Sequence, residues 1–258
     1  VSCDSSAVSR VLSSIVRYHL GLSDSCLVQT IGKQQIFDKS DIQIISPVTK
    51  EKYSWGTATL NPILQDIFNP VEKQAVLKYF NRQPAEYRVG DRILNKRNLN
   101  GFNAYVWSDD THTKLIRTTV NLCNGSIGYV KFIGLADDLS FFRKDSDDAL
   151  IPDYEMQEHS APTKTGLSKV IMLVEYSSYD QPAFLVPYLA ILNNKKGVLF
   201  DTQLTADFDY IELAYALTVH KMQGSQAKLI IAPVFGLPVY KNTMPFINKN
   251  MLYTMISR

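Results

Sequence analysis

The chain has 258 residues, of which 45% are hydrophobic and 20% charged, and its formal net charge is +2. That length allows one large domain or two smaller ones, and the balance is typical of a globular protein. The apolar runs fall short of the roughly 18–20 residues that span a bilayer, and three cysteines without metal-ligand spacing exclude a disulfide framework and a zinc site.

The sequence also gives expectations about the cellular compartment, the extent of the chain and the charge that a nucleic-acid partner would need. Scattered cysteines and the lack of a signal-peptide pattern predict a cytoplasmic protein. The chain starts at Val1 without Met and stops at Arg258 inside a helical pattern, so we expect an excised fragment. Because the net charge is small, a nucleic-acid partner requires a local basic face.

The first seventy residues predict a helix, a strand and a second helix. Asp4–Leu20 has apolar residues at helical spacing, and Asp41–Ser46 is a short, β-branched strand. A polar loop leads to an amphipathic helix with apolar positions from Leu60 to Phe68. Pro62 is expected in the first turn of that helix, and Asn69-Pro70 ends it. The strand and second helix form a β–α unit of a parallel sheet.

Short strand patterns begin near Val89 and predict a small inserted β-barrel. The expected strands are Arg92–Lys96, Ala104–Trp107, Leu115–Val120 and Ser126–Ile133, with a turn at Asn124-Gly125. Basic residues here are interleaved with Phe102, Tyr105 and Trp107, a combination that suits single-stranded nucleic acid. The alternative, preferred for most of these aromatics, is that they fill the barrel core. The basic residues are Arg88, Arg92, Lys96, Arg97, Lys114 and Arg117.

An acidic stretch interrupts this region. Residues 137–158 hold eight acidic residues against two basic ones. Asp137–Pro162 is expected to form a long loop or a partly disordered excursion, away from any nucleic acid. Strand patterns return at 170–175, 184–191 and 197–201. We therefore predict an α/β domain made of residues 1–87 and 210–258, with an inserted region at 88–209.

The part after residue 210 contains the densest group of polar residues that are candidates for binding a ligand. Ala214–Val219 is a short apolar strand that leads directly into polar residues and a Gly224-Ser225 turn. In an extended chain Thr218 and His220 share one face, and Gly224-Ser225 lets backbone N–H groups approach a phosphate. Such groups are expected at the carboxyl ends of parallel strands, where open α/β sheets bind ligands. Leu229–Pro233 reads as another buried strand, and the chain ends in a helical pattern.

The string L-T-V-H-K-M-Q-G-S from Leu217 resembles motif V of superfamily-1 helicases, especially the RecD-like branch, which is similar to the exodeoxyribonuclease V alpha subunit. Gln226 stands where that family usually has Glu, a residue that touches the nucleotide sugar. The final string L-Y-T-M-I-S-R resembles motif VI, which ends here in Arg258.

Two further segments are similar to the same family. Pro47, Lys50 and Gly56, followed by L-N-P-I-L-Q and Asn69-Pro70, match a strand–loop–helix pattern with an insertion before the glycine. The stretch around Asn124-Gly125 resembles a pattern in the family's inserted barrel. The resemblance thus implies a RecA-like parallel-sheet domain with an inserted SH3-like β-barrel.

The resemblance also implies roles for residues. Thr218, His220, Lys221 and Asn61 would bind single-stranded DNA, although Asn61 is equally compatible with a purely structural position. Gly224, Ser225, Gln226 and Lys50 would bind nucleotide. Arg258 would stabilise the charge of the transferring γ-phosphoryl group. ATP and Mg²⁺ would be shared with an N-terminal RecA-like domain, and other helicase–nuclease subunits are possible partners. No membrane and no other metal are implied.

The sequence contains no G-x-x-x-x-G-K-[ST] phosphate-binding loop. We therefore expect this chain not to hydrolyse ATP by itself. Two alternatives stay open: a non-catalytic module that binds single strands through the barrel, and part of a viral-type RNA helicase. A metal-dependent hydrolase that uses His112, His159 or His220 is disfavoured because no two have ligand spacing.

Overall fold

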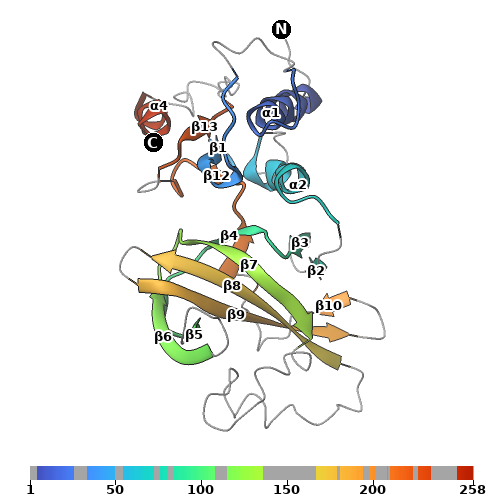
Figure 1. The fold of residues 1–258 in the computed structure, drawn as a ribbon, viewed down its shortest axis with the longest axis vertical. Coiled ribbons are helices and arrows are strands. Elements are labelled where there is room, and N and C mark those ends of the chain that lie inside the picture. Colours follow the sequence, from blue (N-terminus) through green and yellow to red (C-terminus); the bar gives the residue numbers. More distant parts are fainter. Residues whose placement is uncertain are drawn as a thin grey trace, which may run out of the picture. The chain divides into compact units, whose positions relative to one another are not determined.

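The computed structural model describes residues 5–25, 34–49, 55–72, 76–80, 84–107, 115–135, 167–178, 181–193, 198–200, 208, 210–222, 226–233 and 249–257. The chain divides into two compact units (Figure 1). Unit 1 comprises Val1–Pro70 and Ala214–Arg258, and unit 2 comprises Val71–Leu213. Within the described ranges, a helix both long enough and apolar enough to cross a bilayer does not occur.

Unit 1 contains a parallel three-stranded sheet in the order β12-β1-β13. Strand β1 pairs in parallel with both neighbours, which confirms the predicted parallel sheet. All five residues of β1 are buried, as expected for a strand covered on both faces. The elements of the unit are α1 (Ser5–His19), η1 (Lys39–Asp41), β1 (Ile42–Ser46), α2 (Thr57–Phe68), β12 (Ala216–Thr218), β13 (Leu229–Ile231) and α4 (Lys249–Ile256).

Helix α1 forms where apolar spacing predicts it, and it contacts α2. Val8, Leu12 and Val16, at helical spacing, are buried. The helix ends at His19, and Gly21 follows two residues later with a φ of 69°, which suits glycine. The N–H of Gly21 donates to the Tyr18 carbonyl and that of Leu22 to the Arg17 carbonyl, which satisfies two carbonyls of the last turn.

The start of α2 corrects one prediction. The helix begins at Thr57, so Pro62 lies in its interior and not in its first turn. The proline lacks an N–H and leaves the carbonyl four residues earlier without its helical partner. Pro62 is exposed, so this face of the helix is open to water. The helix ends as expected at Asn69, whose N–H donates to the Gln65 carbonyl at 2.7 Å.

Strand β13 also differs from expectation, because Leu229–Ile231 is half-buried and not fully buried. It lies at the end of the sheet order and has β1 as its neighbour on one side. Immediately before it, Lys228 Nζ lies 2.9 Å from Asp41 Oδ2 at the start of β1. The hydrogen bond to Asp41 raises the pKa of Lys228 above its ordinary value. This pair joins the amino-terminal ends of two parallel strands.

The described residues of unit 2 form a twisted sheet of ten strands, in which β7, β8 and β9 lie side by side (Figure 1). The main order is β11-β4-β7-β8-β9-β10-β2-β3, and β5 joins β6 to β9. The strands are β2 (Val76–Phe80), β3 (Pro84–Arg88), β4 (Arg92–Asn95), β5 (Leu99–Trp107), β6 (Leu115–Leu122), β7 (Ile127–Leu135), β8 (Leu167–Ser178), β9 (Gln181–Asn193), β10 (Val198–Phe200) and β11 (Ile211–Leu213).

The expected strands and the turn at Asn124-Gly125 are present, and Gly125 has a φ of 94°. The pairings of the described residues give β6 one neighbour, β5, so closure into an SH3-like barrel is not shown. The division of the chain differs from the predicted boundaries, because β2 and β3 pair with each other and β2 pairs with β10. Residues 71–87 therefore belong to unit 2. The acidic stretch Asp137–Pro162 lies outside the described residues.

Candidate nucleic-acid and nucleotide site

The carboxyl ends of β1 and β12 are adjacent, because Ser46 and Thr218 are register partners in a parallel pair. Ser46 is fully buried, and its hydroxyl lies 3.0 Å from the Val48 carbonyl and also contacts the Trp55 carbonyl. Thr218 is half-buried. The Ser46 hydroxyl thus bonds to the loop between β1 and α2. Thr218, by contrast, leads into the turn that carries the predicted DNA contacts.

The chain turns immediately after Thr218. Residues 219–222 form a turn in which the Met222 N–H donates to the Thr218 carbonyl at 3.1 Å. Val219 and Met222 are buried, Lys221 is half-buried and His220 is exposed. The prediction that Thr218 and His220 share a strand face is therefore wrong, because the strand ends at Thr218. The turn nevertheless leaves His220 exposed, and the buried side chains of Val219 and Met222 attach the turn to the core of the unit.

The start of β12 is fixed by hydrogen bonds from two side chains and by a ring contact. The Asn61 Oδ1 accepts the Ala216 N–H at 2.7 Å, and its Nδ2 donates to the Ala216 carbonyl at 3.2 Å. Gln43 Nε2 donates to the Tyr215 carbonyl at 3.2 Å. The Tyr215 ring stacks on Phe68, with centroids 5.4 Å apart. These contacts fix the backbone two residues before Thr218.

Asn61 therefore has a structural use that the sequence left open. Its side chain is buried, and both of its polar atoms bond to the backbone of β12. Gln43 was missed, although the sequence holds a signal: a buried strand of isoleucines contains one glutamine between Ile42 and Ile44. A buried amide requires hydrogen-bond partners, and the Tyr215 carbonyl is one.

The amino terminus of α2 is closed by its own loop. The N–H of Thr57 donates to the Val48 carbonyl and that of Ala58 to the Thr49 carbonyl, at 3.0 and 3.1 Å. Helix N-termini bind anions through unpaired N–H groups. Two of these groups in α2 are already used, so phosphate binding here depends on other groups.

Several predicted nucleotide-site residues lie outside the described residues: Lys50, Gly224, Ser225 and Arg258. Gln226 is described and exposed. The helical pattern near the end of the chain is confirmed by α4, in which Met255 is buried and Tyr253 is 73% exposed. Of the predicted DNA-binding residues, Thr218, His220 and Lys221 thus lie at one strand end and its turn. Asn61 bonds to the backbone of the same strand, at Ala216.

The basic and aromatic residues of unit 2 have intramolecular contacts. Tyr105 is buried in a cluster with Ile171, Leu173 and Leu185, and Trp107 packs against it. The core-filling interpretation therefore holds for these two aromatics. Arg117 Nη2 donates to Asn103 Oδ1, and the Arg97 guanidinium lies 4.3 Å from the centre of the Tyr210 ring.

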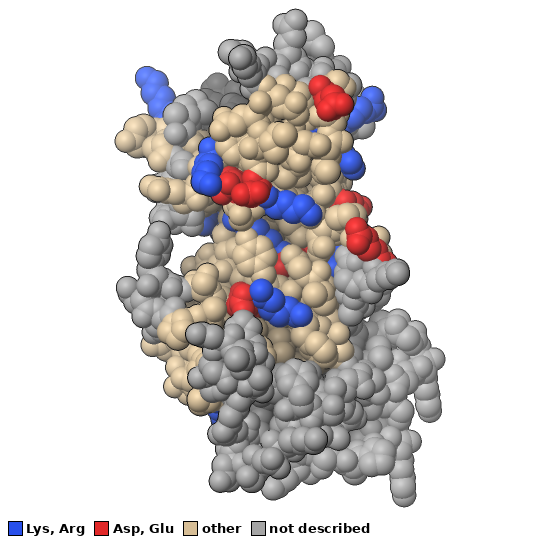
Figure 2. Space-filling model, viewed as in Figure 1, with Lys and Arg blue, Asp and Glu red and all other residues tan. Residues whose placement is uncertain are grey.

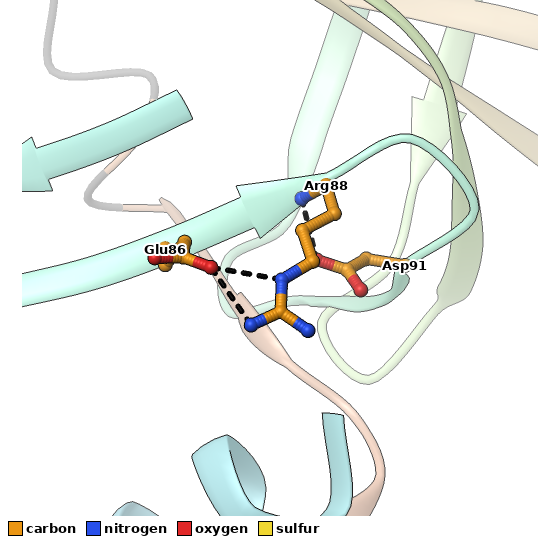
Figure 3. A network of polar contacts seen from close by, with 3 residues as sticks. All are labelled: Glu86, Arg88 and Asp91. Atoms are coloured by element: carbon orange, nitrogen blue, oxygen red, sulfur yellow. Dashed lines mark hydrogen bonds and ion pairs between the residues drawn. The ribbon is translucent and has the colours of Figure 1, made fainter. Parts of the chain in front are cut away.

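The predicted cation Arg88 is buried and paired. Its Nε and Nη2 each lie 2.8 Å from Glu86 Oε1, and its backbone N–H donates to Asp91 Oδ2 at 2.6 Å (Figure 3). The guanidinium is thus paired with a carboxylate of its own strand, β3. On the face drawn in Figure 2, the basic side chains of the described residues are interspersed with acidic ones.

A match to a known protein family covers the C-terminal segment of the chain. Residues 213–258 match the UvrD-like helicase C-terminal domain. The match includes β12 with its turn, β13 and α4. The match supports the prediction that this segment belongs to the C-terminal half of a superfamily-1 helicase. It does not distinguish the RecD-like branch from other branches.

Solved structures with low similarity include a helicase. It is the Pif1 helicase from Bacteroides in complex with ADP-AlF3 and ssDNA, with 15% identity and a TM-score of 0.31. The similarity covers 89% of this chain and 40% of the Pif1 chain. This chain therefore spans less than half the length of that helicase.

Proposed function

We propose that this chain is the C-terminal motor part of an ATP-dependent DNA helicase of the RecD-like kind. The observation that carries the proposal is the match of residues 213–258 to the UvrD-like helicase C-terminal domain. Two features of unit 1 support it: a parallel sheet, and a polar turn at the carboxyl end of its strand β12. In this proposal unit 1 is the second RecA-like domain of the motor.

Single-stranded DNA would bind at the turn after β12. His220 is exposed and Lys221 is half-buried on the same turn, and Thr218 lies at the strand end. Hydroxyl, imidazole and ammonium groups are the donors that contact phosphate oxygens. Such contacts hold the strand by its backbone and give little sequence preference, as a translocating motor requires.

ATP with Mg²⁺ would bind between this domain and an N-terminal RecA-like domain of the same helicase. Gly224, Ser225 and Gln226 follow the DNA-binding turn directly, so one segment would connect the two ligands. Lys50 would add a positive charge, and Arg258 would act on the γ-phosphoryl group. Arginines in that role contribute roughly 10³–10⁵ in rate in other nucleotide hydrolases.

The test uses the complete helicase with His220→Ala, Arg258→Ala and, as control, Lys228→Ala. Lys228 is a basic residue of the same unit at the amino-terminal end of the sheet, paired with Asp41. His220→Ala is expected to weaken single-strand binding and the DNA-stimulated ATPase without changing the melting temperature. Arg258→Ala is expected to abolish ATP hydrolysis and to retain DNA binding, and Lys228→Ala to change neither. Unchanged DNA stimulation in His220→Ala would refute the proposal.

A further inference from the structure

One side chain pairs with both backbone polar groups of Ala216, the first residue of β12. Asn61 accepts the Ala216 N–H at 2.7 Å and donates to the Ala216 carbonyl at 3.2 Å. A primary amide presents a donor and an acceptor together, as the backbone of a neighbouring strand does. Strand β12 has β1 as its one partner in the sheet order of the described residues. Helix α2 thus supplies, through Asn61, hydrogen bonds of the kind that a second neighbour would make.

The same helix also holds the preceding residue. Phe68, seven positions after Asn61, stacks on Tyr215 with an interplanar angle of 27°. From β1, Gln43 donates to the Tyr215 carbonyl. Residues 215 and 216 are therefore attached to both α2 and β1, and the three partners Asn61, Phe68 and Gln43 are buried.

The attachment lies close to the proposed DNA contact. Thr218 is two residues after Ala216, which is about 6.6 Å along a strand. The Thr218 carbonyl then accepts the Met222 N–H and closes the turn that exposes His220. A displacement of Ala216 would pass through this short strand to the turn, because β12 runs without a break from Ala216 to Thr218.

We propose that Asn61 is a positioning residue: it sets the place of the turn 219–222, and so of His220, without touching nucleic acid. The effect on DNA rests on the proposed function. The two hydrogen bonds between Asn61 and Ala216, called the clamp below, do not depend on it. The positioning role replaces the direct DNA contact that the sequence resemblance implied for Asn61. The amide has both of its polar atoms bonded inside the protein and only 7% of the residue exposed.

The first measurement is amide hydrogen exchange in this chain. Asn61→Ala is expected to accelerate exchange at Ala216 by about tenfold or more and to leave helix α1 unchanged. Asn61→Asp keeps an acceptor for the Ala216 N–H but places a second oxygen against the Ala216 carbonyl, so a smaller acceleration is expected. It also serves if Asn61→Ala does not fold. The control is Pro62→Ala, an exposed neighbour on α2, which should leave Ala216 unchanged.

The second measurement is single-strand affinity of the complete helicase in a double-mutant cycle with His220→Ala. If Asn61 acts through the turn, Asn61→Ala weakens binding by about tenfold in the native background and has little further effect in His220→Ala. Additive losses, or unchanged exchange at Ala216, would overturn the inference.

The failure of the proposed function has a different signature. In that case exchange at Ala216 accelerates in Asn61→Ala, but neither Asn61→Ala nor His220→Ala changes DNA affinity. The clamp would then stand as a structural feature, and the positioning role for DNA would be overturned together with the function.

Discussion

The turn between β3 and β4 allows a quantitative prediction. Asp91 is fully buried, and its Oδ2 accepts the Arg88 N–H at 2.6 Å (Figure 3). The Asp91 N–H returns a bond to the Arg88 carbonyl, and Gly90 between them has a φ of 91°. The Asp91 carbonyl also accepts the Val130 N–H from β7. The carboxylate therefore fixes a turn on which the register of two strands depends.

Asp91→Ala removes the acceptor and leaves the Arg88 N–H in a buried site. Losing a hydrogen bond to a charged group and leaving its partner unsatisfied costs about 2–3 kcal/mol, or a factor of roughly 30–150 in the unfolding equilibrium. For a unit of this size the melting temperature should fall by roughly 6–10 °C. Asp91→Asn keeps an oxygen acceptor and should cost about 1 kcal/mol.

Urea unfolding of the purified chain measures these costs. The matched control is Lys131→Ala, which removes the ion pair between Lys131 and Glu175, at 2.8 Å and with the lysine half exposed. Exposed pairs contribute about 0–1 kcal/mol. If Asp91→Ala and Lys131→Ala shift the urea midpoint equally, the argument from burial is wrong.

Two further predictions concern β7 and β8. A Cβ on Gly128 would lie 2.7 Å from the Glu175 carbonyl oxygen, so Gly128→Ala should destabilise the chain by about 1–3 kcal/mol in urea unfolding, and an unchanged midpoint would contradict the geometry. Burial raises the pKa of Tyr176 well above its ordinary value of 10.0, despite the hydrogen bond to Tyr188. Because the unfolded chain loses this proton near pH 10 and the folded chain retains it, stability should fall as the pH rises above 10. Tyr176→Phe should flatten that fall, and identical pH profiles for the two proteins would exclude this tyrosine as its source.

The local pattern of the sequence predicted most elements. Helix α1 and strands β4 to β9 follow from apolar periodicity and from the turn residues Asn124-Gly125. Pro62 was misplaced because the helix starts three residues before Leu60, where Thr57 and Ala58 donate to the loop carbonyls. These two hydrogen bonds depend on the path of the loop before the helix, and local sequence propensity does not predict that path.

The candidate site was predictable only in part. The exposed position of His220 agrees with the polar character of the turn, but the chain leaves the strand earlier than alternation implied. The partners of Asn61 and Gln43 lie 155 and 172 residues away in the sequence. Pairings at such separations are set by the whole fold. The burial of Arg88 was likewise hidden, because its partner Glu86 is two residues away on a strand whose facing was unknown.

The 172-residue separation of Gln43 and Tyr215 has a consequence for how the protein acquires its structure. Closing a disordered loop of that length costs about 4–5 kcal/mol in chain entropy beyond a constant. Among the described residues, the strand pairings of unit 2 join residues of that unit to one another, so unit 2 can fold without the three-stranded sheet. Its prior folding would shorten the effective loop between β1 and β12. The parallel sheet is therefore expected to form last during refolding, after the insertion has become compact.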